Sequence, residues 1–164
     1  MTKAGLIAVL LMGVAASASA APQCYRASEI EAEQAMRYQA KLMVISDTCR
    51  SSSYNQFVTR NSKLIVAYQH ALIDRFRRGD ARHAEDAFDR FLTKLANQYA
   101  LGAGQQTVDA LCGQSAAFLT QARDFRAEDF RRFVAQEAVE ERQSYPRCAE
   151  ESAAALPREP LKRD

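Results

Sequence analysis

The residues of this chain with the most definite chemistry are its four cysteines: Cys24, Cys49, Cys112 and Cys148. They form no Cys-x-x-Cys motif, so no thiol has a neighbour in sequence that could resolve a mixed disulfide during redox catalysis. An even number of widely spaced cysteines is typical of structural disulfides in exported proteins. We therefore predict two structural disulfides.

The N-terminal segment favours the oxidising compartment that such disulfides need. Lys3 precedes an apolar run at positions 6–14, and positions 18–20 carry the small side chains of a signal-peptidase site. This pattern predicts a signal peptide over residues 1–20 that is cleaved near Ala20. The mature protein is then expected to be periplasmic or secreted.

Helix length limits how the cysteines can pair. A helix predicted over 28–47 would be about 28 Å long, which places Cys24 and Cys49 at its opposite ends. Disulfide Cα atoms lie only about 4.4–6.8 Å apart, so a Cys24–Cys49 bond is excluded and two pairings remain. We favour Cys49–Cys112 with Cys24–Cys148, because in an alternating bundle the first and third helices finish at the same end.

Other residues that could do chemistry are scattered along the chain. His70 and His83 lack the spacing of a metal site such as His-Glu-x-x-His, and no Gly-x-Ser-x-Gly nucleophile motif occurs. Gly102 and Gly104 have no third glycine of a phosphate-binding loop, and helix termination explains them better. We therefore assign no catalytic residue, no metal and no cofactor.

A group of arginines is the clearest candidate anion-binding feature, since guanidinium groups bind carboxylate or phosphate with two parallel hydrogen bonds. Its members are Arg75, Arg77, Arg78 and Arg82. Acidic residues are interleaved with them, and mixed-sign runs usually face water. A solvated helix end is therefore the competing interpretation.

Apolar residues recur at helical spacing along most of the chain, and alternating strand patterns are missing. Residues 21–150 are therefore predicted to form one all-α domain, an antiparallel bundle of four to five helices crosslinked by the two disulfides. Mixed charge and two prolines predict a disordered tail over 151–164. The helices are expected at about 28–47, 54–78, 81–101, 108–122 and 127–143.

Local signals mark the helix ends. Ser28 with Glu31, and Ser53 with Gln56, have the spacing of capping boxes, and Asp80 is placed to cap the third helix. The last apolar run of the first helix, at 42–45, predicts that this end is the more deeply buried one.

Two further features leave alternatives open. Gly113 marks a place where the fourth helix could be interrupted. Aromatic residues at helical spacing are expected in the core, although they could also line a ligand cavity. These are Phe57, Tyr68, Phe76, Phe88, Phe91 and Phe118.

Charge argues against two classes of partner. The formal net charge is +2 and becomes +1 without Lys3, which gives no strong field for nucleic acid or an anionic membrane surface. The apolar run of the leader is too short to span a bilayer, and no later stretch approaches the length needed. We expect no nucleic-acid partner and no membrane span.

The segment Glu29-Ile-Glu-Ala-Glu-Gln-Ala-Met-Arg-Tyr-Gln-Ala-Lys-Leu-Met-Val-Ile-Ser-Asp-Thr-Cys49 resembles the opening of a family of small exported helical bacterial proteins that carry no assigned function. The resemblance covers the first two helices and the flanking cysteines. It implies a compact secreted helical protein and supplies no catalytic residue.

These observations favour a non-catalytic exported protein that binds a protein partner in the cell envelope. Two alternatives belong to other classes. One is a small secreted hydrolase that uses scattered carboxylates or His70. The other is a carrier that holds a small apolar ligand within the bundle.

Overall fold

The computed structural model describes residues 24–148. The predicted signal peptide and the predicted tail lie outside the described residues. The elements are α1 (Ala27–Thr48), α2 (Ser53–Gly79), α3 (Ala84–Ala103), α4 (Val108–Asp124), α5 (Ala127–Glu141) and the 3-10 helix η1 (Arg142–Ser144).

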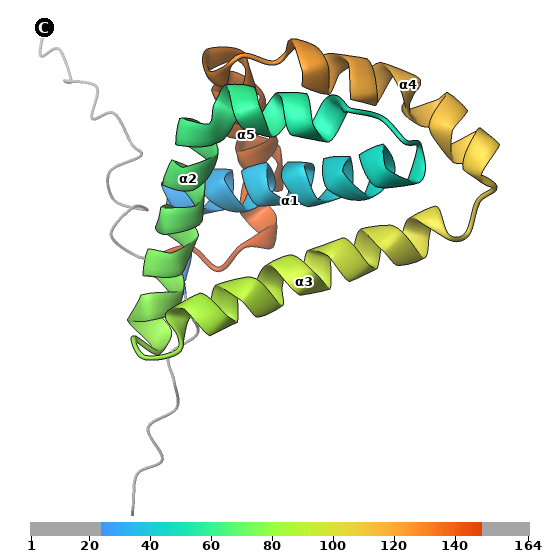
Figure 1. Cartoon of the computed structure of the whole chain (residues 1–164). Coiled ribbons are helices and arrows are strands. Elements are labelled where there is room, and N and C mark those ends of the chain that lie inside the picture. Colours follow the sequence, from blue (N-terminus) through green and yellow to red (C-terminus); the bar gives the residue numbers. More distant parts are fainter. Residues whose placement is uncertain (1–23, 149–164) are drawn as a thin grey trace, which may run out of the picture.

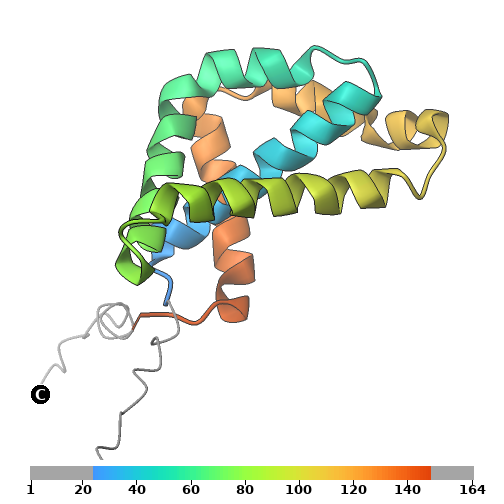
Figure 2. The same cartoon turned by 60° about the horizontal axis from the view of Figure 1, so that its bottom comes forward.

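α1 is the central element, and the other four α-helices lie around it (Figures 1 and 2). Ile30, Ala35, Met36 and Leu42 of α1 are at most 1% exposed. This explains why the sequence of α1 lacks one clear polar face, since a helix with neighbours on several sides buries several sides. Each large apolar side chain buried in this way contributes about 1.5–3 kcal/mol.

α2 changes direction part-way along its length. Its first half runs antiparallel to α1 and its second half turns away (Figures 1 and 2). Asn61 is buried in this helix, and its Nδ2 donates to the carbonyl oxygens of Phe57 at 2.9 Å and Phe125 at 3.2 Å. The second bond attaches α2 to the connection between α4 and α5.

The predicted fold class is confirmed. Residues 24–148 form an all-α antiparallel bundle in which α3 and α4 also run in opposite directions (Figure 1). Two disulfides crosslink it, Cys24–Cys148 and Cys49–Cys112, which is the pairing that the helix geometry favours. None of the helices in these residues is long and apolar enough to cross a membrane.

An aromatic cluster forms the core between α1, α2, α4 and α5. The ring of Tyr38 lies at its centre, with centroids 5.1–5.8 Å from five other rings. The five are Phe57, Phe118, Phe125, Phe130 and Phe133. Because Phe57 and Phe130 are fully buried, these rings pack as core.

Three predicted helix starts are wrong in detail. α2 begins at Ser53 itself, after Ser52, and the side chain of Gln56 donates to the hydroxyl of Ser52 instead of forming a capping box with Ser53. The carboxylate of Glu29, instead of that of Glu31, closes the first turn of α1 by accepting from the amide of Arg26 at 2.9 Å. α3 begins at Ala84, three residues later than predicted, because Asp80 accepts from the amide of Arg82 and lies 2.8 Å from the ring nitrogen of His83. Asp80 thus organises a short turn before the helix.

Both ends of the described chain meet beside the start of α1. Tyr25 donates its amide to the carbonyl of Pro146 at 2.7 Å, and Cys148 donates its amide to the carbonyl of Tyr25 at 3.2 Å. The Cys24–Cys148 disulfide fixes the same contact covalently. The second disulfide, Cys49–Cys112, lies at the opposite end of α1.

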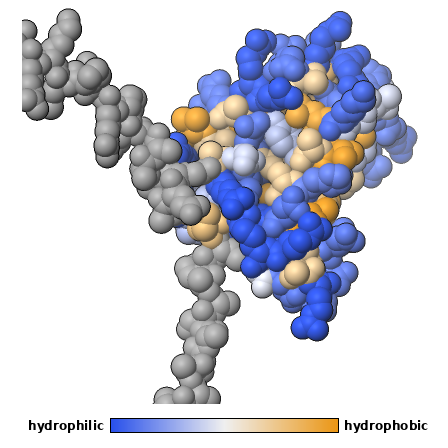
Figure 3. All heavy atoms as spheres, turned by 90° about the vertical axis from the view of Figure 1, so that its left-hand side faces the viewer, coloured by the Kyte–Doolittle hydropathy of each residue, from blue (hydrophilic) through white to orange (hydrophobic). Residues whose placement is uncertain are grey.

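The side of the molecule over α2 has a mostly polar surface. Figure 3 shows hydrophilic residues around smaller areas of apolar ones on this face. Val66 of α2 is 46% exposed, but isolated exposed apolar residues of this kind are normal on protein surfaces. This face therefore gives no argument for a binding surface.

Candidate binding cleft

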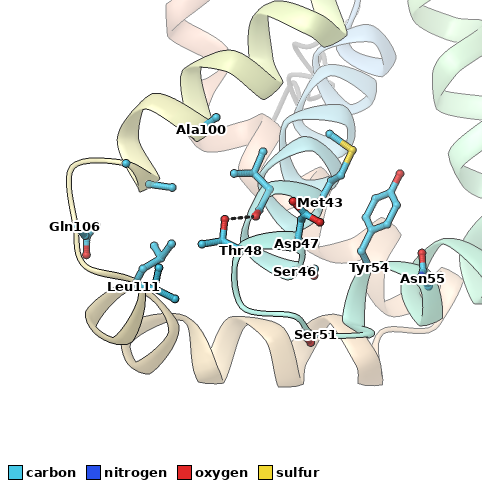
Figure 4. A pocket seen from close by; sticks show the side chains of 14 residues that line it. Met43, Ser46, Asp47, Thr48, Ser51, Tyr54, Asn55, Ala100, Gln106 and Leu111 are labelled. Carbon is cyan, nitrogen blue, oxygen red and sulfur yellow. Dashed lines mark hydrogen bonds between the residues drawn. The ribbon is translucent and has the colours of Figure 1, made fainter.

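A cleft lies where α1 and α3 end and where α2 and α4 begin (Figure 4). Its volume is about 660 Å³, which falls within the range of roughly 300–1,000 Å³ typical of small-ligand sites. We call it the corner cleft. Its apolar lining residues are Met43, Val44, Ala100, Ala103, Val108 and Leu111.

The end of α1 shapes one wall of the corner cleft. The amide of Ser51 donates to the carbonyl of Ser46 at 2.8 Å, and the amide of Arg50 donates to that of Asp47 at 3.1 Å. These are the two bonds of a Schellman motif, in which a residue with positive φ follows the helix. Arg50 takes that conformation with φ 52°, at a position where glycine is usual.

The start of α4 forms the facing wall. The hydroxyl of Thr107 accepts from the amide of Ala110 and caps the helix, as Ser and Thr commonly do at this position. The Cys49–Cys112 disulfide then ties this first turn to the end of α1. Two walls that are distant in sequence are therefore held together covalently.

Some hydroxyl groups of the corner cleft already form hydrogen bonds within the protein, and one does not. Thr48 donates to the carbonyl of Val44 at 2.9 Å, and the hydroxyls of Ser51 and Ser53 lie 2.7 Å apart. Ser46 is only 3% exposed, yet its Oγ has no hydrogen-bond partner. A buried hydroxyl of this kind is uncommon and needs a specific explanation.

One charged side chain lines the corner cleft. Asp47 is exposed, and no ion pair or hydrogen bond to its carboxylate is found among residues 24–148. No histidine, lysine or arginine is among the described residues of the lining. This arrangement can hold an apolar group and make polar contacts with it.

Three of the four candidate anion-binding arginines already contact other groups of the protein. The Arg75 guanidinium is buried 3.6 Å above the ring of Tyr25, and that of Arg77 pairs with Asp74 at 2.5 Å. Arg78 forms an ion pair with Glu29 at 2.5 Å. The fourth, Arg82, has an exposed side chain.

The two histidines lie outside the corner cleft. His70 is exposed on α2, while His83 precedes α3 and its ring contacts Asp80. Within residues 24–148, no group of three or more His, Cys, Asp and Glu side chains could hold a metal ion.

A buried polar network lies at the other end of α1. The carboxylate of Glu33 accepts from the hydroxyls of Tyr25 at 2.8 Å and Tyr145 at 3.0 Å, and from the guanidinium of Arg37 at 2.6 Å. Burial, followed by the charge of Glu33, raises the pKa of Tyr145 to about 12. The same two causes raise the pKa of Tyr25 above its ordinary value. The network joins α1 to both ends of the described chain.

Sequence reasoning missed the residues of the corner cleft. The apolar run at 42–45 was expected in the core, but Met43 is 38% exposed and lines the cleft with Val44. The sequence did contain one signal. Four successive apolar residues point to all sides of a helix, so a single neighbouring helix could not cover all of them.

The chain was also compared with known proteins. No family model, no curated protein and no solved structure matches it. Its proposed function therefore rests on its own residues and geometry.

Proposed function

We propose that this chain is a non-catalytic binding protein of an extracytoplasmic compartment, and that the corner cleft holds the apolar part of a small ligand. The observation that carries the proposal is the cleft itself. It has the volume of a small-ligand site, walls built largely from apolar side chains, and an adjacent disulfide that fixes two of those walls.

The compartment follows from the sequence and the cysteines taken together. The N-terminal pattern is that of a signal peptide, and all four cysteines are disulfide-bonded. Disulfides of this kind persist in oxidising spaces such as the periplasm. Cleavage near Ala20 and export remain part of the proposal, and the intact mass of the processed chain tests both.

Native mass spectrometry of protein purified from its producing cells tests ligand binding. We expect an additional mass that dissociates on denaturation. Ala100→Phe, which adds an aromatic ring inside the cleft, should abolish it. Ser62→Phe adds the same ring at an exposed position of α2 and should leave it unchanged. Equal occupancy in both variants would place the ligand elsewhere.

The second candidate is a protein that binds a protein partner in the cell envelope. It is favoured by Leu101 at 72% exposure and Val108 at 56% exposure, which lie on α3 and α4 near the corner cleft. Exposed apolar residues that are close together can mark interaction sites. A photocrosslinking residue at Leu101 should then capture one envelope protein repeatedly, while one at Val66 of α2 should not.

A further inference from the structure

We propose that the corner cleft selects ligands in which an apolar body carries a cationic amine. This inference rests on the proposed function, because it names the chemical class of the ligand for the same cleft. Three independent features support it: an unpartnered buried hydroxyl, a single unpaired carboxylate, and the orientation of the helices that end there.

The hydroxyl of Ser46 is the first feature. It is almost completely buried and without a partner, and leaving a buried polar group unpaired is unfavourable. The neighbouring hydroxyls of Thr48 and Ser51 already bond to their own chain. A serine hydroxyl can accept as well as donate, so a bound ligand that displaces the side chains covering Ser46 would gain a hydrogen-bond partner there.

The carboxylate of Asp47 is the second feature. It is the one charged group among the described lining residues, and it has no ion-pair partner. A single negative charge beside apolar walls attracts cations and repels anions. Fatty acids and phosphate esters are therefore disfavoured as ligands, whereas an ammonium group satisfies Asp47 and can donate to Ser46.

The helix ends are the third feature. α1 and α3 both finish at the corner cleft, and neither has a basic residue in its last turn. The C-terminal end of a helix carries partial negative charge and favours a nearby cation. α4 begins at the same place, but Thr107 caps its first turn and the acidic Asp109 lies within that turn. The two helix ends therefore favour a cation, while Arg50 places one positive charge just beyond the end of α1.

The apolar walls explain why a bare cation is a poor ligand. Met43 of α1 lies across the lining from Leu111 of α4 (Figure 4), and Val44 and Val108 belong to the same lining. Burial of alkyl groups against such walls provides most of the binding free energy of small ligands. Met43 can also adjust to ligands of different shape, because its side chain is unbranched and flexible.

The test is a titration of the oxidised protein, followed by NMR chemical shifts, with three probes of equal chain length: hexylammonium, hexanol and hexanoate. We expect hexylammonium to bind most tightly, with the largest shifts at Thr48 and Leu111. Asp47→Asn should weaken hexylammonium binding about fivefold, the upper end for an exposed ion pair, and leave hexanol binding unchanged.

Two variants separate recognition from general effects. Asp109→Asn removes the same charge outside the lining and should change hexylammonium binding less than Asp47→Asn. Ser46→Ala should weaken hexylammonium binding while slightly raising the melting temperature, because it removes an unpaired buried polar group. If Ser46 only supported the fold, Ser46→Ala would not weaken hexylammonium binding while raising the melting temperature.

The outcomes distinguish this inference from the proposed function. If hexanol or hexanoate binds in the cleft as tightly as hexylammonium, or if Asp47→Asn leaves hexylammonium binding unchanged, the selection of amines is wrong and the apolar cleft remains. If none of the probes shifts the cleft residues, both the amine selection and the small-ligand function are overturned.

Discussion

At the scale of single residues, Glu33 is one of two buried carboxylates that stabilise the N-terminal end of α1. Its side chain is 4% exposed and accepts hydrogen bonds from two tyrosines and one arginine. Glu33→Gln keeps the shape but removes the charge that these donors face. Because Arg37 is partly exposed, we expect a loss of about 3 kcal/mol, the lower end for a broken buried pair.

Urea denaturation of both proteins measures this loss. Glu128→Gln is the matched control, because Glu128 forms a 3.5 Å ion pair with Arg131 on the surface of α5. Exposed pairs of this kind contribute at most about 1 kcal/mol. Similar losses in the two variants would show that the network around Glu33 adds no more than a surface pair.

Glu29 gives the protein a defined sensitivity to acid. Burial by itself raises the pKa of Glu29, but hydrogen bonds from Arg78 and the amide of Arg26, together with the charge of Arg78, lower it below its ordinary value of 4.5. A lowered folded-state pKa stabilises the folded protein above the unfolded-state pKa. That contribution is lost as the pH falls through the folded-state pKa.

We therefore expect the free energy of unfolding to decrease as the pH drops below about 4.5. Glu29→Gln should lower the stability at pH 7 and flatten this acid dependence. Unfolding curves at pH 7, 5, 4 and 3 measure both effects. An unchanged slope below pH 4.5 in the variant would show that other carboxylates dominate acid unfolding.

At the scale of elements, α4 continues without a break through Gly113. A Cβ added at Gly113 would meet nothing within 4 Å. Alanine is favoured over glycine inside a helix because glycine loses more backbone entropy on folding. Gly113→Ala should therefore stabilise the protein by about 0.5–1 kcal/mol.

Thermal denaturation measures this gain. Gly102→Ala is the comparison, since its Cβ would also be free of contacts but lies in the last turn of α3, where fraying reduces the benefit. A destabilised Gly113→Ala variant would indicate that α4 is not regular at this point in solution.

The elements also show what sequence patterns can predict. Helical spacing gave the helices to within a few residues, because each pattern depends on neighbours one turn away. Helix length excluded one of the three disulfide pairings, and the alternating order of helices in a bundle favoured the pairing that is observed. The turn that ends α1 was harder to predict, because Arg50 adopts positive φ where glycine would have been the usual signal. The change of direction in α2 was also not predictable, because no proline lies in this helix.

The corner cleft could not be predicted in this way. Its lining comes from the ends of α1 and α3 and the starts of α2 and α4, so it exists only once these helices are placed relative to one another. Ser46 shows the difficulty, because a serine that follows an apolar run gives no sign that its hydroxyl lacks a partner. Ligand chemistry of this kind depends on tertiary structure.

At the scale of the whole molecule, the two disulfides constrain loops of different length. Cys24–Cys148 joins residues separated by 124 positions, and Cys49–Cys112 joins residues separated by 63. In the chain-entropy model a doubled loop adds only about 0.6 kcal/mol. Replacing either pair by alanines should therefore lower stability by similar amounts, within the usual range of about 2–5 kcal/mol.

Urea denaturation of the two double variants tests this prediction. The variant without Cys49 and Cys112 should in addition bind hexylammonium more weakly, because the walls of the corner cleft are no longer tied together. The variant without Cys24 and Cys148 should keep that binding. A much larger stability loss for one pair would show that native packing, more than loop entropy, determines the effect.

The joining of the two ends of the described chain has a practical consequence for handling this molecule. Tyr25 and Arg147 form a bridge beside the first turn of α1, whereas the corner cleft lies at the far end of that 22-residue helix, about 33 Å away. A purification handle, sensor-chip linkage or fused reporter appended after Cys148 would start on the side remote from the corner cleft. Immobilised protein should therefore remain fully titratable.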